Sequence, residues 1–394
     1  MRILMIAPTS FFSDYGGHIR ILEETKALQE LGHQVAIVTY YKGSDLPGID
    51  IRRTAPLPWH TDYEVGSSRH KIAFDVYLAV KAWQEFRQFR PHIIHGHMHE
   101  GALIGGVLAR IYGVPLVFDF QGSLTGEMVD HNFLDPNGRI YPWIHRLEKY
   151  IDHLPNAILT SSHQSMTLLK DKFGVPHHIL HPLPDCADPT RFDPLRFTEA
   201  DKQARRQELN IPSGRPIVAY LGLLTEYQGV PHLLDAAAQL IQQGENVHFL
   251  VMGYPNVPYY QAMAAEKGLS GYITFTGKVE YRFAPDYLAL GDIAVAPKMS
   301  STEGSGKLLN YMALGQPVVA YDSPVHREYL AEFGVYAPLG DSKALAEGIR
   351  TLLYDEEKRV CLGKQLRKRA LTVYSWQAAM KQVANLYHHL TAVS

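Results

Sequence analysis

The chain has 394 residues, of which 46% are hydrophobic, and its 38 basic side chains nearly balance its 40 acidic ones. This length and composition predict two or three globular domains and exclude a mainly disordered protein. The net charge of −2 provides no broad positive field to attract nucleic acid. With two cysteines, a short apolar run after Met1 and no uninterrupted apolar stretch of membrane-spanning length, the sequence predicts a cytoplasmic protein.

Short apolar segments alternate with segments of helical period along the chain, which predicts an α/β fold with mostly parallel sheets. Residues 3–7 are expected to form a strand, followed by a glycine-containing loop, a helix over 19–31 and a strand over 35–38. The same design begins again with a strand over 217–221 and a loop at Gly222. Two openings of one kind predict two Rossmann-like domains.

A proline-rich segment between residues 182 and 216 separates the two predicted domains and also contains the charged run 199–208. We therefore expect an N-terminal domain over 1–190 and a C-terminal domain over 210–374. Ser375 is a good N-cap for a final helix with one apolar stripe, which we expect to pack on a domain.

Paired open α/β sheets bind ligands at the carboxyl ends of their strands, so the cleft between the domains is the expected site. A dinucleotide cofactor is disfavoured, because no Gly-x-Gly-x-x-Gly follows the first strand and no carboxylate follows the second.

In the stretch 296–320, a strand, a Gly/Ser loop and a short helix follow one another. Their geometry presents backbone N–H groups at Ser305, Gly306 and Lys307, which form an anion site. Helical spacing directs Lys307, Asn310 and Tyr311 toward the loop.

This stretch resembles the donor-sugar motif of the retaining GT-B glycosyltransferases of family 4, through Glu303-Gly304 and the segment 312–319. Other fragments occur in the family's order along nearly the whole chain: Gly16-Gly17 with Arg20, 32–35, 95–97, 188–192, 220–222, 277–279, 291–293 and Glu328. The resemblance implies two Rossmann-like domains facing across a cleft and a C-terminal helix, 375–394, that returns to the first domain. It also implies a nucleotide-sugar, bound as a substrate rather than a cofactor and held mainly by the second domain.

Geometry and resemblance together give a set of candidate site residues. The catalytic candidates are Gln121 and Glu303. The donor-binding candidates are Gly17, Arg20, Gly222, Val279, Lys298, Ser305, Gly306, Lys307 and Asn310. The loop 119–132 follows a strand, so Glu127, Asp130 and His131 are candidate acceptor contacts, with a solvated surface loop as the alternative.

Four positions depart from the family's pattern. Leu223 and Gln228 stand where the family usually has an arginine and a lysine that hold the diphosphate, and Asn310 stands where it has a ribose-binding glutamate. Gln121 replaces a histidine that faces the donor sugar. A diphosphate in a water-poor cleft requires charge compensation, for which Lys298, Lys307 and Arg20 are the local candidates. With these candidates we favour an active enzyme with altered donor contacts. The missing groups leave a pseudoenzyme as the alternative.

Two other patterns have structural alternatives. His92, His95, His97 and His99 alternate along a predicted strand, but few ligating partners accompany them, so we predict no metal site. The segment 74–90 mixes aromatic and basic residues, which fits either core packing or peripheral membrane contact.

The sequence thus predicts a metal-independent hexosyltransferase that moves a sugar from a nucleotide-sugar to a hydroxyl acceptor with retention. A nucleotide-sugar epimerase of similar fold would instead use cleft carboxylates as acid and base. A non-catalytic sugar-nucleotide-binding protein is the third reading.

Overall fold

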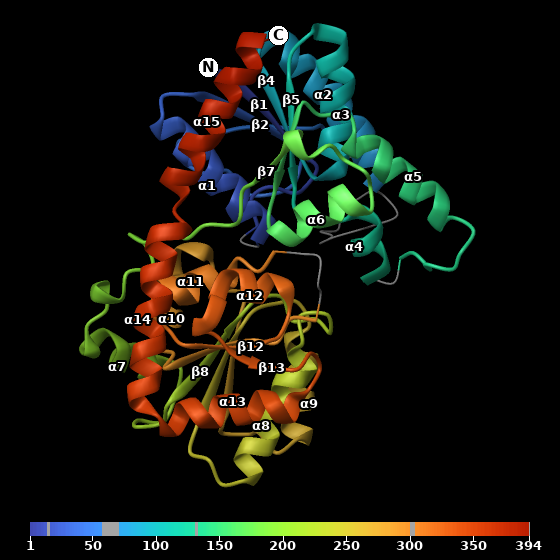
Figure 1. The fold of residues 1–394 in the computed structure, drawn as a ribbon. Helices are drawn as coiled ribbons and strands as arrows, with labels where there is room; N and C mark the ends of the chain where they lie inside the picture. Colours follow the sequence, from blue (N-terminus) through green and yellow to red (C-terminus); the bar gives the residue numbers. More distant parts are fainter. Residues whose placement is uncertain (14–15, 57–70, 131–132, 300–303, 394) are drawn as a thin grey trace.

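The computed structural model describes residues 1–13, 16–56, 71–130, 133–299 and 304–393, which form two parallel sheets (Figure 1). The first sheet has the order β3-β2-β1-β4-β5-β6-β7. Its strands are β1 (Arg2–Ala7), β2 (Gln34–Thr39), β3 (Asp50–Arg53), β4 (Ile93–His97), β5 (Leu116–Phe120), β6 (Ala157–Thr160) and β7 (Leu180–Pro182). All described pairs are parallel, and Met5 lies opposite Ile37 and His95. This is the strand order of a Rossmann fold.

Alternate residues of these strands face opposite layers, as the period of a strand requires. Ile3 and Met5 pack with the helices α1 (Gly16–Glu30) and α15 (Trp376–Val393). Leu4 and Ile6 pack on the other face. That face is covered by α2 (Lys71–Phe89), α3 (Met98–Tyr112), α5 (Tyr141–Asp152) and α6 (His163–Asp171), while α4 (Leu124–Asp130) follows β5. Both faces of the sheet are therefore buried, which explains the nearly continuous apolar composition of its strands.

The second sheet repeats this design with the order β10-β9-β8-β11-β12-β13. Its strands are β8 (Ile217–Leu221), β9 (His248–Met252), β10 (Ile273–Gly277), β11 (Ile293–Ala296), β12 (Val318–Tyr321) and β13 (Val335–Ala337). One face is covered by α8 (Val230–Gln242), α9 (Val257–Glu266) and α13 (Ser342–Tyr354). The other is covered by α10 (Ala284–Leu288), α11 (Lys307–Ala313), α12 (Pro324–Leu330) and α14 (Glu356–Val373). The predicted pair of Rossmann-like domains is confirmed.

The chain crosses between the two domains twice. The first crossing contains α7 (Glu199–Glu208), whose start is closed by a capping box between Thr198 and Asp201. The second runs from α14 into α15, where Ala187 N–H donates to the carbonyl of Tyr374 at 3.1 Å. Figure 1 shows α15, in red, ascending from the second domain and lying along α1. The C-terminal helix therefore returns to the N-terminal domain, as the family resemblance implied.

The segment 74–90 lies mainly in α2, which packs one face on the core and leaves Val76 and Val80 exposed. Phe86 is buried, and Phe74 and Phe89 pack against the same apolar cluster, whereas Trp83 is exposed. Among the described residues, no helix combines the length and apolar character that crossing a bilayer requires.

Candidate active site

A cavity of about 760 Å³ lies between the carboxyl ends of the two sheets and is lined by residues of both domains. The N-terminal domain supplies residues from the loops after β1 and β5 and from the start of α1. The C-terminal domain supplies residues from the loops after β8, β9 and β11 and from α11. The expected position of the site, at the ends of parallel strands, therefore coincides with this cavity.

The helix α11 presents one polar face to this cavity. Lys307 and Asn310 line the cavity, as predicted from their spacing. Leu308, Leu309, Met312 and Ala313 are fully buried against the sheet, as expected. Tyr311 differs from the expectation, because it is fully buried and its hydroxyl accepts a hydrogen bond from Leu221 N–H at 2.8 Å. This hydrogen bond ties α11 to the end of β8, so Tyr311 has a structural role rather than a place in the cavity wall.

Lys307 is held by one of the residues that depart from the family's pattern. Its Nζ donates to Gln228 Oε1 at 2.8 Å and lies 4.6 Å from the centre of the Tyr220 ring. A Cβ added at Gly222 would lie 2.5 Å from Lys307 Nζ. Gly222 therefore makes room for the lysine, and Gln228 fixes its direction. The sequence suggested a lost cation at 228 and a substitute cation at 307 separately, whereas the structure joins the two positions by a hydrogen bond.

Lys298 is the second lysine of the cavity wall and is almost completely buried, with 4% of its surface exposed. Its Nζ donates to the carbonyl of Gly304 at 2.8 Å, which ties the end of β11 to the loop before α11. In that loop the Ser305 hydroxyl is buried and has no hydrogen-bond partner among the described residues. An unsatisfied buried hydroxyl at a cavity wall is costly, so it is a candidate ligand contact.

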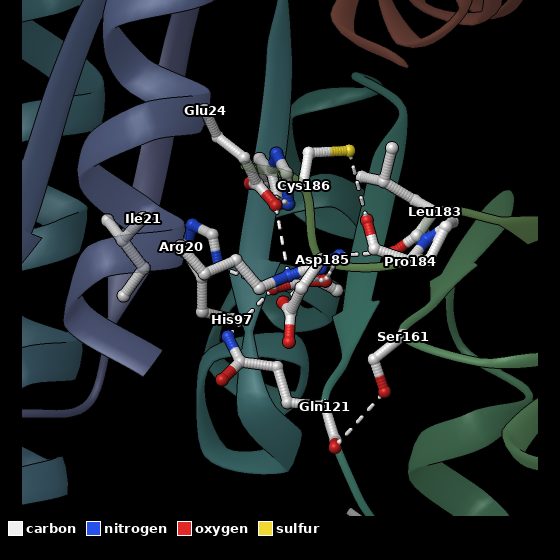
Figure 2. Close-up of polar contacts among 12 residues, drawn as sticks. Arg20, Ile21, Glu24, His97, Gln121, Ser161, Leu183, Pro184, Asp185 and Cys186 are labelled. Carbon is white, nitrogen blue, oxygen red and sulfur yellow. Dashed lines mark hydrogen bonds and ion pairs between the residues drawn. The ribbon is translucent and has the colours of Figure 1, made fainter. Parts of the chain in front are cut away.

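Arg20 lies in the cavity wall but is surrounded by acidic groups (Figure 2). Its guanidinium donates to Asp119 at 2.7 Å, to Asp185 at 2.9 Å and to the Leu183 carbonyl at 3.0 Å, and its Nε lies 3.1 Å from Glu24 Oε1. Its positive charge is therefore largely neutralised inside the protein. The contact between Arg20 and the donor stays a prediction, and these bonds give Arg20 a role in fixing Asp119 and Asp185.

The two buried carboxylates beside Arg20 differ in their ionisation. Burial favours the neutral form of Asp119, but the Arg20 guanidinium and the His97 ring outweigh it and hold the pKa of Asp119 well below its usual range. Burial, assisted by the negative charge of Asp119, raises the pKa of Glu24 well above its usual range despite Arg20. Asp119 is therefore the ionised partner of Arg20.

Asp185 was not identified from the sequence, and its neighbours show its importance. A Cβ added at Gly304 or Gly306 would lie 3.1 or 3.0 Å from Asp185 Oδ2, so this carboxylate packs against the loop before α11. Its other oxygen binds Arg20. Asp185 thus links α1 of the first domain with the anion loop of the second. Its only sequence signal was a position in the proline-rich segment after the last strand of the first sheet.

Gln121 is held at the cavity by two neighbours. Its Nε2 donates to Asp119 Oδ2 at 2.8 Å, and its Oε1 would lie 2.9 Å from a Cβ added at Gly17. Gly17 therefore leaves room for this close approach, and the Gln121 amide oxygen is directed toward the start of α1. Val279 also lines the cavity.

The histidines of the predicted strand do not form one cluster. The rings of His95 and His97 stack at 4.4 Å, but His92 lies at the opposite end of β4, where its Nδ1 accepts from Arg2 N–H at 2.9 Å. Glu24, His95, His97 and Asp119 have ligand atoms within 4.8 Å of one another. Because Asp119 is already paired with the Arg20 cation and burial raises the pKa of Glu24 well above its usual range, this buried group does not fit a divalent metal ion.

His99 belongs to a second buried group, with Glu148 and Asp152. Glu148 accepts hydrogen bonds from Ser123 Oγ, Leu124 N–H, Thr125 N–H and Thr125 Oγ1. These donors form the start of α4, so Glu148 caps that helix from α5 and has no lone pair to spare for a metal.

The acceptor candidates Glu127 and Asp130 lie on α4 and line the cavity opposite α11. They are joined there by Phe133 and Tyr41, which give this side of the cavity an apolar component. Two predicted site residues, His131 and Glu303, lie outside the described residues.

His18 is a cavity residue that the sequence reasoning missed, although it directly follows the Gly16-Gly17 pair. Its Nδ1 accepts from Ser13 N–H at 2.8 Å, so the neutral ring carries its proton on Nε2, which bonds to Thr9 Oγ1. Burial, with a smaller effect from the charge of Lys278, lowers the pKa of His18 to about 3. The ring is neutral and fixed.

The sequence matches two family models in succession. Residues 16–191 match the model described as Glycosyltransferase Family 4, and residues 201–369 match Glycosyl transferases group 1. The chain is 27% identical over 291 residues to the alpha-D-kanosaminyltransferase of Streptomyces kanamyceticus, covering 72% of this chain and 73% of that protein. It is 26% identical over 396 residues to the phosphatidyl-myo-inositol mannosyltransferase of Mycobacterium leprae, covering 98% of this chain and 96% of that protein.

Solved structures agree on the architecture. The sucrose-phosphate synthase from Thermosynechococcus elongatus superposes over 100% of both chains with a TM-score of 0.84 at 20% identity. Anabaena HepE, in complex with UDP-glucose, gives a TM-score of 0.79 at 17% identity over 99% of this chain and 100% of that one. Because the family models lie one in each domain and the two sheets have this shared arrangement, the chain belongs to the GT-B glycosyltransferases of family 4.

Proposed function

We propose that this glycosyltransferase moves a hexosyl group from a nucleotide-sugar to a hydroxyl acceptor with retention of anomeric configuration. The observation that carries the proposal is the placement of Lys307, Lys298 and the Ser305 hydroxyl on one wall of the cavity and of Gln121, Glu127 and Asp130 on the other. A diphosphate fits the first wall, and a polyhydroxy acceptor fits the second.

The diphosphate is proposed to bind at the loop before α11. Lys307, directed by Gln228, and the buried Lys298 supply positive charge there. The Ser305 hydroxyl supplies a hydrogen-bond donor. Asn310 faces the same cavity one helical turn further on, where its amide can bond to ribose hydroxyls without adding a charge. This arrangement compensates for the missing cations at Leu223 and Gln228.

The proposed transfer needs no protein base at position 121. The bond between the anomeric carbon and the phosphate oxygen breaks, and a bond from the acceptor oxygen forms on the same face of the sugar. The acceptor's proton passes to the departing phosphate oxygen. Gln121 has no titratable group, so it positions the sugar by hydrogen bonding, with its amide fixed by Asp119. Two lysines provide the electrostatic stabilisation that a metal ion provides in other transferases.

The relatives also support transfer over epimerisation. The two described above are named as a kanosaminyltransferase and a mannosyltransferase, and the structural relative HepE was solved with UDP-glucose. A nucleoside diphosphate sugar is accordingly the donor class that we propose for this chain.

A thermal-shift panel of UDP-, GDP- and ADP-sugars tests donor binding directly. A ligand present at 100 times its dissociation constant should stabilise the protein by about 2.7 kcal/mol. Release of nucleoside diphosphate with a hydroxyl acceptor, and an anomeric proton coupling in the product that matches the donor, would support retaining transfer. Failure of every donor to bind would refute the proposal, and binding without turnover would favour the non-catalytic alternative.

A further inference from the structure

Asp185 lies where the two walls of the cavity meet. One oxygen of its carboxylate, Oδ1, accepts a hydrogen bond from the Arg20 guanidinium at 2.9 Å (Figure 2). The other oxygen, Oδ2, would lie 3.1 Å from a Cβ added at Gly304 and 3.0 Å from one added at Gly306. Asp185 lines the cavity, and 20% of its side chain is exposed. The carboxylate therefore connects α1 of the first domain with the loop that precedes α11 in the second.

The second oxygen of Asp185 is open to a ligand. Within the described part of the chain, Oδ2 receives no hydrogen bond, and Arg20 is the only cation that forms an ion pair with this carboxylate. Arg20 also pairs with Asp119, whose pKa is held well below its usual range, so one guanidinium serves two ionised carboxylates. The negative charge of Asp185 is therefore neutralised only in part. At this junction the cavity wall presents a hydrogen-bond acceptor and a surplus of negative charge.

The hexosyl group of a donor is expected at the same junction. In the proposed reaction the anomeric carbon is bonded first to the phosphate and then to the acceptor oxygen, so the sugar lies between the wall with Lys307 and the wall with Gln121. Asp185 borders both walls. Its Oδ2 lies against the loop before α11. On the other side, Arg20 joins Asp185 to Asp119, which accepts a hydrogen bond from Gln121 Nε2 at 2.8 Å.

We propose that Asp185 determines the specificity for the donor sugar: it favours nucleotide-sugars whose sugar is uncharged or carries an amino group, and it disfavours those whose sugar is acidic. A hydroxyl or ammonium group of the sugar can donate a hydrogen bond to Oδ2. A carboxylate or sulfonate on the sugar has no proton to donate, and Asp185 repels its charge in a site partly shielded from water. The inference rests on the proposed function, because it concerns the donor of that reaction.

A purely structural role for Asp185 leads to a different expectation. If the carboxylate only tied Arg20 to the loop before α11, replacing it would change the affinity for every donor by the same factor. A residue that discriminates between sugars instead changes the ratio of two donor affinities. That ratio is therefore the quantity to measure, and the nucleoside diphosphate without a sugar provides the reference.

The test is isothermal titration calorimetry of the full-length protein with a matched pair of donors. For the nucleoside that the thermal-shift panel selects, the pair is the nucleoside diphosphate hexose and the corresponding hexuronic acid, which differ only at C6. For uridine these are UDP-glucose and UDP-glucuronic acid. We expect the hexose to bind about tenfold more tightly or better, which is within the range of repulsion between two like charges roughly 5 Å apart.

Asp185→Asn keeps the size of the side chain and an acceptor for Arg20 but removes the charge. It should reduce the ratio of the two affinities by roughly tenfold. Glu226→Gln is the matched control, because Glu226 is also an acidic residue of the cavity wall but lies in the loop after β8. This variant removes the same charge from the cavity and should leave the ratio unchanged.

Three results would overturn the inference. The first is equal affinity of the unchanged protein for the two donors, a measurement that needs no variant. The second is an unaltered ratio in Asp185→Asn when its binding of the nucleoside diphosphate shows that it is folded. The third is an equal change of the ratio in Glu226→Gln, which would assign the selection to the overall charge of the cavity. Failure of the unchanged protein to bind the nucleoside diphosphate or any donor would instead refute the proposed function.

Discussion

At the scale of single residues, Lys307 carries the strongest expectation. Its ammonium is directed by Gln228 at the loop where we place the diphosphate. Lys307→Ala should weaken nucleotide-sugar binding by about 10- to 150-fold, because a hydrogen bond to a charged group contributes roughly 1.5–3 kcal/mol. Isothermal titration calorimetry measures this change, with the exposed Lys364→Ala as the matched control.

The pair of residues 228 and 307 offers a sharper control. Gln228→Lys alone places a second ammonium beside Lys307 and should weaken folding, because like charges repel in a partly buried site. Adding Lys307→Gln restores one lysine and one glutamine and should recover much of that loss. Unchanged donor affinity in Lys307→Ala would remove this lysine from the donor site. If the exchanged pair does not recover stability, the hydrogen bond between positions 228 and 307 cannot form with the two side chains exchanged.

His18 makes a prediction about pH. Its folded-state pKa is about 3 because of burial and the charge of Lys278, whereas an unfolded histidine has its usual value near 6.5. Between these values the unfolded chain binds a proton that the folded protein does not, so stability falls as the pH falls from 6.5 toward 3. This single group contributes up to about 1.4 kcal/mol per pH unit.

The measurement is urea unfolding at two pH values within that window. His18→Gln keeps an acceptor for Ser13 N–H but has no titrating ring, so its stability should depend less steeply on pH. The exposed His389→Gln should leave the slope unchanged. If the unfolding free energy of the His18 variant depends on pH as steeply as that of the unchanged protein, other buried groups govern the loss of stability in acid. His326, with its pKa of about 4, is one such group.

At the scale of elements, Glu148 determines how α4 is held. Its carboxylate satisfies two backbone N–H groups and two hydroxyls at the start of that helix. Glu148→Gln replaces one oxygen by a donor that faces other donors, so we expect a loss of about 1–3 kcal/mol of unfolding free energy. Since α4 carries Glu127 and Asp130, the acceptor KM should rise while donor affinity is unchanged.

Denaturant unfolding and two-substrate kinetics measure these effects, and the exposed Glu347→Gln serves as the control. If donor affinity falls as much as acceptor affinity, Glu148 supports the whole domain rather than the acceptor helix in particular.

The helices themselves were predictable to different degrees. The expected helix over 19–31 is α1 (Gly16–Glu30), and the second opening is β8 with its loop at Gly222, because apolar period and glycine position identify such elements directly. The burial of Glu148 and Asp152 on α5 was not predicted. No sequence pattern marked these two acidic residues, and only the packing of α4 and α3 against α5 shows that they are buried.

At the scale of the whole molecule, α15 joins the two domains. It follows α14 of the second domain and packs on α1 of the first, where the Tyr387 hydroxyl bonds to His95 Nδ1 at 2.6 Å. Both partners are fully buried. Tyr387→Phe should therefore lower the unfolding free energy by about 1–3 kcal/mol, because His95 loses a buried partner. Urea unfolding measures this loss, and Tyr354→Phe, at an exposed tyrosine, should change stability far less. A neutral Tyr387→Phe would show that apolar packing alone docks the helix.

The sequence by itself determined the class of fold, the two domains, the family and the place of Lys307 and Asn310 on the cavity side of α11. These depend on local period, on glycine and proline positions and on a motif that is continuous in the chain. The tertiary structure decided what depends on residues distant in sequence. Arg20 is neutralised by Asp119 and Asp185, which lie 99 and 165 residues away, and Lys307 is directed by Gln228, 79 residues before it. The charge that a side chain presents to a ligand depends on its neighbours in space, and a linear sequence does not place those neighbours together.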